Sequence, residues 1–219
     1  MIPHIIVLAT SKGGAGKSTL ARSLASYWIN LEFHTAIIDA DPQGSIIKRH
    51  DPQGLLSKLK VVANPEETIG QTILELKDTY KPIIVDTGGF KNKTSIRALL
   101  QSDFVLIPLK PSSDDMIAAI ETYQLIKELN EVPERKGIPI KTKMILTMTQ
   151  QGTVISKHIR DELQSVGMPL MKSEMYQRVV YPETAIKGLS PCITEPEGAA
   201  ARDISSIIQE INTIYEEKK

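Results

Sequence analysis

Apolar residues along the chain alternate between short continuous runs and longer stretches with helical spacing. The short runs, rich in isoleucine, valine and leucine, are typical of strands buried on both faces of a sheet. We expect strands near residues 4–10, 34–39, 58–63, 82–86, 103–109, 141–147 and 168–172. Between them, helices are predicted near residues 17–31, 66–80, 93–101, 113–131 and 152–166. This alternation predicts an α/β fold: a mostly parallel, twisted sheet with helices on both faces.

The clearest apolar face belongs to the expected helix at 113–131. We predict that this face packs into the core and is not an interface with another molecule. Its apolar residues are Ile117, Ile120, Tyr123, Leu125, Ile126 and Leu129.

A glycine-rich segment follows the first expected strand and precedes the first expected helix. Residues 11–19 read Ser-Lys-Gly-Gly-Ala-Gly-Lys-Ser-Thr. This order is that of a P-loop, in which glycines let backbone N–H groups converge on a phosphate at a helix N-terminus. Lys17 then neutralises β- and γ-phosphate oxygens, and Ser18 offers its hydroxyl to Mg²⁺. The predicted nucleotide-binding residues of the loop are Gly13, Gly14, Ala15, Gly16, Lys17, Ser18 and Thr19.

Acidic residues lie at the ends of two later strands, at the edge of the sheet where the P-loop is expected. Asp39 and Asp41 belong to the segment Asp-Ala-Asp-Pro-Gln, and Asp86 ends the strand at 82–86. A buried carboxylate is costly unless a cation is near, and Mg²⁺ is the natural one. We therefore predict that Ser18, Asp39 and Asp86 serve Mg²⁺. For Asp39 the alternative is an indirect role, in which it pairs with a P-loop lysine or a magnesium-bound water.

The pattern Lys-Gly-Gly-x-Gly-Lys-Ser-Thr, with Lys12 ahead of the glycines, resembles the deviant Walker A box of the ParA/MinD family of ATPases. Residues 35–45, 82–89 and 106–115 resemble later boxes of the same family, in the same order. The likeness is greatest to the small ParA-type proteins of plasmid partition and the similar VirC1 proteins. It implies a P-loop NTPase fold that binds ATP and Mg²⁺.

The resemblance also implies catalytic roles for Lys12, Lys17 and Asp41. Lys12 matches a lysine that reaches across a nucleotide-sandwich dimer to the partner's phosphates, and Asp41 matches the carboxylate that orients the attacking water. One carboxylate acting alone lowers the barrier little, so we expect slow hydrolysis until a partner completes the site. Gly88 and Gly89 resemble a switch segment that reorients when the γ-phosphate leaves.

Adenine contacts are harder to place from the residues. Thr149 and Gln150 occupy a position where relatives of the family hold the base, and residues 175–185 lie where relatives carry a second loop near the nucleotide. The alternative for the first segment is an ordinary strand-to-helix turn with Thr149 as the N-cap.

The length and composition of the chain limit the number of domains and the kinds of site that it can contain. Its 219 residues, 41% of them hydrophobic, predict a single P-loop ATPase domain over 1–219. Only ten residues precede the P-loop, so we expect no N-terminal helix-turn-helix domain. The one cysteine excludes a disulfide framework and a cysteine-based metal site. No apolar stretch approaches the length of a membrane span, so we expect a cytoplasmic protein. The resemblance implies that it associates with the nucleoid.

The formal net charge is zero, so any binding to nucleic acid must come from a local basic patch. The resemblance implies an ATP-bound homodimer that binds duplex DNA without sequence preference and meets a ParB-type centromere-binding adaptor protein, in plasmid or chromosome partition. The predicted DNA-binding residues are Lys157, Arg160, Arg178 and Lys187.

Three alternatives differ from partition in cargo or class: a ParA-like ATPase that positions a conjugation complex or another cargo, a membrane-positioning ATPase of MinD type, and a metabolic P-loop enzyme similar to dethiobiotin synthetase. Lys12 argues against the metabolic enzyme. The C-terminal stretch has apolar residues at 204, 207, 208, 211 and 214, but Glu210, Glu216 and Glu217 on its polar face would repel anionic lipid. We therefore expect a docked terminal helix and no membrane binding.

Overall fold

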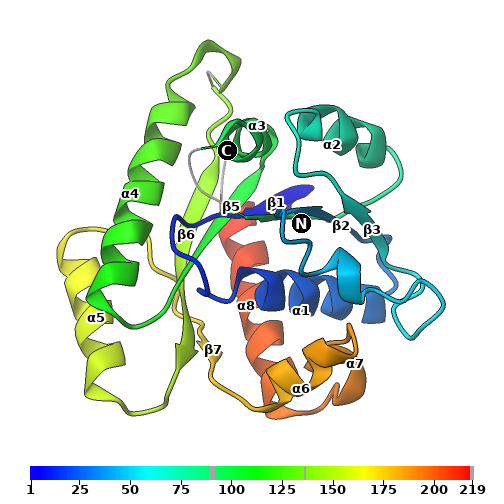
Figure 1. Ribbon diagram of the computed structural model, residues 1–219. Coiled ribbons are helices and arrows are strands. Elements are labelled where there is room, and N and C mark those ends of the chain that lie inside the picture. Colours follow the sequence, from blue (N-terminus) through cyan, green and yellow to red (C-terminus); the bar gives the residue numbers. More distant parts are fainter. Residues whose placement is uncertain (89–91, 136, 218–219) are drawn as a thin grey trace.

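The computed structural model describes residues 1–88, 92–135 and 137–217, so Gly89 of the expected switch segment lies outside the described residues. One parallel sheet organises them, with the strand order β3-β2-β4-β1-β5-β6-β7. Its strands are β1 (Ile5–Leu8), β2 (Ala36–Ala40), β3 (Lys60–Ala63), β4 (Ile83–Thr87), β5 (Phe104–Leu109), β6 (Lys141–Thr149) and β7 (Met175–Tyr176). The prediction of a parallel α/β fold is confirmed (Figure 1).

Helices cover both faces of the sheet. They are α1 (Lys17–Asn30), α2 (Ile69–Lys77), α3 (Lys93–Gln101), α4 (Ser113–Asn130), α5 (Val154–Ser165), α6 (Val180–Ile186), α7 (Pro191–Thr194) and α8 (Ala199–Glu216), with 3₁₀ turns η1 (Ile47–Arg49) and η2 (Pro133–Arg135). One apolar core joins the sheet to α1, α6, α7 and α8, and a second joins it to α2, α3, α4 and α5. Successive strand residues point to opposite faces, so Ile6 belongs to the first core and Val7 to the second.

The register of the central strands brings the acidic strand ends together. Asp86 of β4 pairs with Leu8 of β1 on one side and with Asp39 of β2 on the other. Because the strands are parallel, these residues lie at the carboxyl edge of the sheet, where the loop between β1 and α1 also begins.

The strand predicted at 168–172 is wrong. Only an isolated bridge between Met144 and Leu170 forms there, and β7 lies five residues further on. A longer strand would need the backbone hydrogen-bonding groups of this segment, but side chains from distant elements already bind them. Glu210 of α8 accepts the N–H groups of Lys172 and Ser173, both at 2.8 Å, and so diverts this backbone from strand pairing.

Two predictions about helix faces have different outcomes. On α4, Ile126 and Leu129 are buried as expected, but Ile117 is 55% exposed and does not belong to the core face. The buried side of α4 instead includes Met116 and Ala119, which lie in the same core as Ile126 and Leu129. Successive helix residues are rotated by about 100°, so Ile117 turns away from the face that Met116 buries. The terminal helix docks as predicted: α8 buries the isoleucines at 204, 207, 208 and 211. None of the described helices is long and apolar enough to cross a membrane.

Candidate nucleotide-binding site

The glycine-rich loop between β1 and α1 has the backbone of a phosphate cradle. Gly14 and Gly16 have φ angles of +72° and +82°, which glycine adopts without steric cost. Gly16 is the N-cap of α1, so the loop delivers backbone N–H groups to a helix N-terminus. Thr147 of β6 donates from Oγ1 to the Ala15 carbonyl at 2.9 Å, which fixes the loop against the sheet. The sequence placed Thr147 only at the start of the segment expected near adenine, because its contact with Ala15 exists only in the fold.

Lys17, the first residue of α1, is 8% exposed and belongs to this loop. Its ammonium donates to the Lys12 carbonyl at 3.5 Å. Burial lowers the pKa of Lys17, and the nearby Asp86 and Asp41 oppose that effect. A buried ammonium group beneath a glycine loop suits an anionic ligand, because phosphate oxygens would restore the interactions with water that burial removed.

Asp86 is fully buried, and neither carboxylate oxygen accepts a hydrogen bond from the residues that the structure describes. Burial raises its pKa to about 7, and the nearby Ser18 hydroxyl only partly offsets this rise. An orphaned buried carboxylate beside a serine hydroxyl is the oxygen donor set that Mg²⁺ prefers at phosphate sites. Ser18 and Asp86 therefore fit the predicted metal.

Asp39 is also fully buried, but its oxygens are occupied by backbone groups. One oxygen accepts the N–H of Asp41 at 3.3 Å, and the other accepts those of Ile46 and Ile47, both at 2.9 Å. These bonds hold the loop between β2 and η1. The sequence did not predict this backbone role, and a part for Asp39 at the magnesium site, direct or through a water, stays a prediction.

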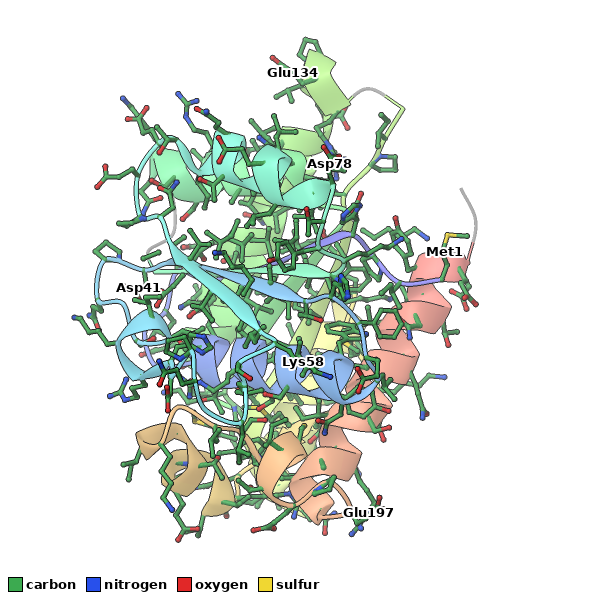
Figure 2. The ribbon with its side chains drawn as sticks, turned by 90° about the vertical axis from the view of Figure 1, so that its right-hand side faces the viewer. Met1, Asp41, Lys58, Asp78, Glu134 and Glu197 are labelled. Carbon is green, nitrogen blue, oxygen red and sulfur yellow. The ribbon has the colours of Figure 1, made fainter. Side chains whose placement is uncertain are left out.

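Asp41 lies at the edge of the molecule, beside the loop that leads into η1 (Figure 2). Its Oδ1 accepts the N–H of Gln43 at 2.8 Å, which leaves the second oxygen without such a bond among the described residues. Gly88 packs directly against it: a Cβ atom at Gly88 would lie 2.8 Å from the Asp41 carboxyl carbon and 2.9 Å from its Cα. Gly88 thus matters here for close approach, whereas the sequence suggested only chain mobility.

Lys12 forms an ion pair with Asp114 of α4, with Nζ 3.2 Å from Oδ2. The pair is exposed, with 40% of the lysine side chain and 78% of the aspartate side chain accessible. The neighbouring Ser112 is the N-cap of α4, and its hydroxyl oxygen accepts the N–H of Asp115 at 3.2 Å. Asp115 in turn accepts the Ser112 hydroxyl at 2.7 Å and the N–H of Lys110 at 3.2 Å. These bonds fix the start of α4 and hence the position of Asp114.

The residues expected near adenine lie at the end of β6. Thr149 is 1% exposed, and its hydroxyl has no hydrogen-bond partner among the described residues. Gln150 is exposed and donates to Gln177 at 3.0 Å. The alternative role of Thr149 as a helix cap is wrong, because α5 begins at Val154 with Thr153 as its N-cap. An adenine contact by Thr149 and Gln150 stays a prediction.

The four predicted DNA-binding residues do not form one free patch. Arg160 pairs with Glu174, and Arg178 makes a bidentate ion pair with Asp203 of α8 at 2.7 and 3.0 Å. Both arginines are therefore charge-compensated and hold the β7 region against its neighbours. Lys157 and Lys187 are exposed. Sequence reasoning missed this because the acidic partners lie 14 and 25 residues away along the chain.

A phosphate-cradling loop, a buried lysine and two buried acidic strand ends at one edge of a parallel sheet define a P-loop nucleotide-binding protein. Residues 6–192 match the family of the CobQ/CobB/MinD/ParA nucleotide binding domain. The chain belongs to this family, as its motifs predicted, and within it to the ParA/MinD-type ATPases.

Relatives span nearly all of the chain. Protein ParA of Rhizobium radiobacter is 28% identical over 180 residues, which cover 81% of this chain and 80% of that protein. Maintenance of carboxysome distribution protein A of Halothiobacillus neapolitanus is 21% identical over 210 residues, covering 94% and 95%. An ATP complex of a McdA variant from Cyanothece superposes with a TM-score of 0.73 at 15% identity, covering 99% of this chain and 97% of that one. That structural likeness shows the fold.

Proposed function

We propose that this protein is an ATP-dependent dimerising switch that hydrolyses ATP slowly. One observation carries the proposal: the P-loop, Lys17, the Ser18–Asp86 pair and Asp41 converge at one edge of the sheet. The ATP complex of the McdA variant supports ATP as the nucleotide.

Each group of residues in the site has a separate role in the transfer of the γ-phosphoryl group to water. The loop N–H groups and Lys17 bind the phosphates and offset their charge. When bound, Mg²⁺ neutralises charge on the phosphate oxygens, held through Ser18 and Asp86. Asp41 accepts a hydrogen bond from the attacking water with its unoccupied oxygen and orients that water. A single carboxylate lowers the barrier little when it acts alone, which is why we expect slow turnover.

Dimerisation depends on Lys12. Two facing triphosphates repel each other strongly in a water-poor interface, so each subunit must supply a cation for closure. In the monomer Lys12 is held by Asp114, an exposed pair that costs little to break. Release of Lys12 from Asp114 frees it for the partner's phosphates.

The catalytic assignment is tested by ATP binding and turnover of two variants. Lys17→Ala abolishes nucleotide binding, whereas Asp41→Ala keeps binding and loses turnover. The chain offers a matched control, because Asp51-Pro52-Gln53-Gly54 repeats the sequence of residues 41–44. Asp51 accepts the N–H of Gln53 at 2.9 Å, as Asp41 does with Gln43, but it lies outside the site. Asp51→Ala therefore keeps wild-type turnover, and wild-type turnover in Asp41→Ala contradicts the assignment.

We further propose that the switch acts in plasmid or chromosome partition, binding duplex DNA without sequence preference and meeting a ParB-type adaptor that stimulates hydrolysis. ParA relatives from Rhizobium radiobacter and Myxococcus xanthus support this cargo. The free cations Lys157 and Lys187 are the proposed DNA contacts. Dimerisation doubles them on one duplex, so affinity rises with ATP.

The DNA test uses a double variant, Lys157→Ala with Lys187→Ala, because Arg160 and Arg178 support the fold. We expect weaker, less salt-dependent DNA binding with unchanged ATP hydrolysis. The control pairs Lys77→Ala with Lys127→Ala, which removes the same charge from other exposed helix positions. An equal loss of DNA affinity in both double variants would mean that Lys157 and Lys187 do not form the contact surface.

A further inference from the structure

The loop between β2 and η1 touches the proposed metal site through one side chain. Ser45 donates a hydrogen bond from its hydroxyl to the Ser18 hydroxyl, with the two oxygens 2.9 Å apart. The two serines lie 27 residues apart in the chain, so the contact joins separate segments of the site. Ser45 ends the segment 35–45 that resembles a box of the family, but the sequence assigned it no role.

Two arginines hold Ser45 in place through its backbone. Its carbonyl accepts from Arg22 at 3.3 Å and from Arg49 at 3.0 Å. Arg22 lies one helical turn after Ser18 on α1 and is only 5% exposed. The bonds of the following two residues to Asp39 restrain the same loop from the other side. Ser45 is therefore a fixed donor, because its carbonyl and the next two N–H groups are all engaged.

The direction of the hydrogen bond decides what the Ser18 oxygen can do. A serine hydroxyl has one proton to donate and two lone pairs to accept. Ser45 uses one lone pair of the Ser18 oxygen. The proton of Ser18 then remains for the neighbouring Asp86, and the second lone pair remains for a cation. Mg²⁺ demands near-ideal octahedral geometry, so a ligand whose orientation is fixed in advance binds it better.

We propose that Ser45 is a positioning residue for the magnesium site: its hydroxyl orients the Ser18 oxygen toward the metal. The inference rests on the proposed function, since it assumes that Mg²⁺ accompanies the nucleotide at this P-loop. Ser45 also belongs to the loop that carries Asp41. The same hydrogen bond thus links the metal-binding hydroxyl to the segment that orients water.

The test measures how much a divalent cation strengthens ADP binding, by isothermal titration with ADP in EDTA and then in Mn²⁺. No hydrolysis occurs, so catalysis does not contribute to the signal. Loss of an outer partner of a metal ligand typically costs about 10- to 100-fold in metal affinity. In Ser45→Ala, the factor by which Mn²⁺ raises the affinity for ADP should fall about tenfold, and the affinity for ADP in EDTA should stay unchanged.

Two further variants keep the result interpretable. Ser45→Thr retains the hydroxyl and should restore most of the Mn²⁺ effect. Ser57→Ala, an exposed serine later in the same connection, should behave as wild type, and thermal melting checks that all three variants fold. The inference would be overturned if Mn²⁺ strengthened ADP binding in Ser45→Ala as much as in the wild type. It would also be overturned if Ser45→Ala lost ADP affinity equally in EDTA and in Mn²⁺. Absence of ADP binding by the wild-type protein would instead overturn the proposed function.

Discussion

Gly88→Ala tests whether the position of Asp41 sets the rate of hydrolysis. The added Cβ would lie 2.9 Å from the Cα of Asp41, whereas ordinary contacts begin near 3.4 Å. Because the clash involves backbone, a new side-chain rotamer cannot relieve it, and the two segments must move apart by about 0.5 Å, which displaces Asp41 relative to Gly88. A misplacement of about 1 Å can cost roughly 100-fold in rate. We therefore expect kcat to fall by about tenfold, with little change in ATP affinity.

The assay is steady-state phosphate release, together with the affinity for ATP measured separately. Gly70→Ala on α2 is the matched control, since its Cβ meets only the side-chain amide of Gln101, which can rotate away. That variant should keep wild-type turnover. If Gly88→Ala also hydrolyses ATP at the wild-type rate, the contact between Gly88 and Asp41 does not position the carboxylate, and the reasoning fails.

Three other predictions follow from individual contacts. Asp114→Asn frees Lys12 and should strengthen the ATP-dependent dimer by up to about fivefold in sedimentation velocity, because exposed ion pairs are weak; a weaker dimer would contradict this. Arg178→Ala leaves Asp203 unpaired and should cost about 2 kcal/mol in urea unfolding; an unchanged midpoint would refute it. Burial raises the pKa of Asp86 from 3.8 to about 7, so the folded chain holds this proton more tightly than the unfolded chain, and stability falls as pH rises through that window. In EDTA, Asp86→Asn should therefore be more stable than wild type at pH 8 and lose that advantage near pH 4; an advantage independent of pH would exclude titration as its cause.

The parts of the fold that sequence could predict are those set by local periodicity. Buried strands and amphipathic helices depend on neighbouring residues, so the order of elements and the P-loop follow from the chain. The second expected strand, for example, ends at Ala40 in the structure, one residue beyond its predicted end. The strand at 168–172 could not be judged this way, because the competing hydrogen bonds come from Glu210 on α8.

In the candidate site, too, the sequence predicts features that depend on neighbouring residues and misses those that depend on distant contacts. Lys17 and Asp86 could be predicted because motif residues and strand ends carry their chemistry locally. The contacts of Gly88 with Asp41 and of Ser45 with Ser18 could not, since each joins segments that only the fold brings together. Arg178 misled for the same reason: its charge is visible in the sequence, but its bidentate partner Asp203 is visible only in the fold.

The central claim is an ATP-dependent dimer closed by Lys12, and the mass of the particle in solution tests it most directly. Multi-angle light scattering of Asp41→Ala should give the monomer mass of 24.2 kDa without nucleotide or with ADP, and twice that mass with Mg-ATP. Lys12→Ala in the same background should stay at 24.2 kDa with Mg-ATP. A mass that does not change with ATP, or a dimer that persists without Lys12, would contradict the account.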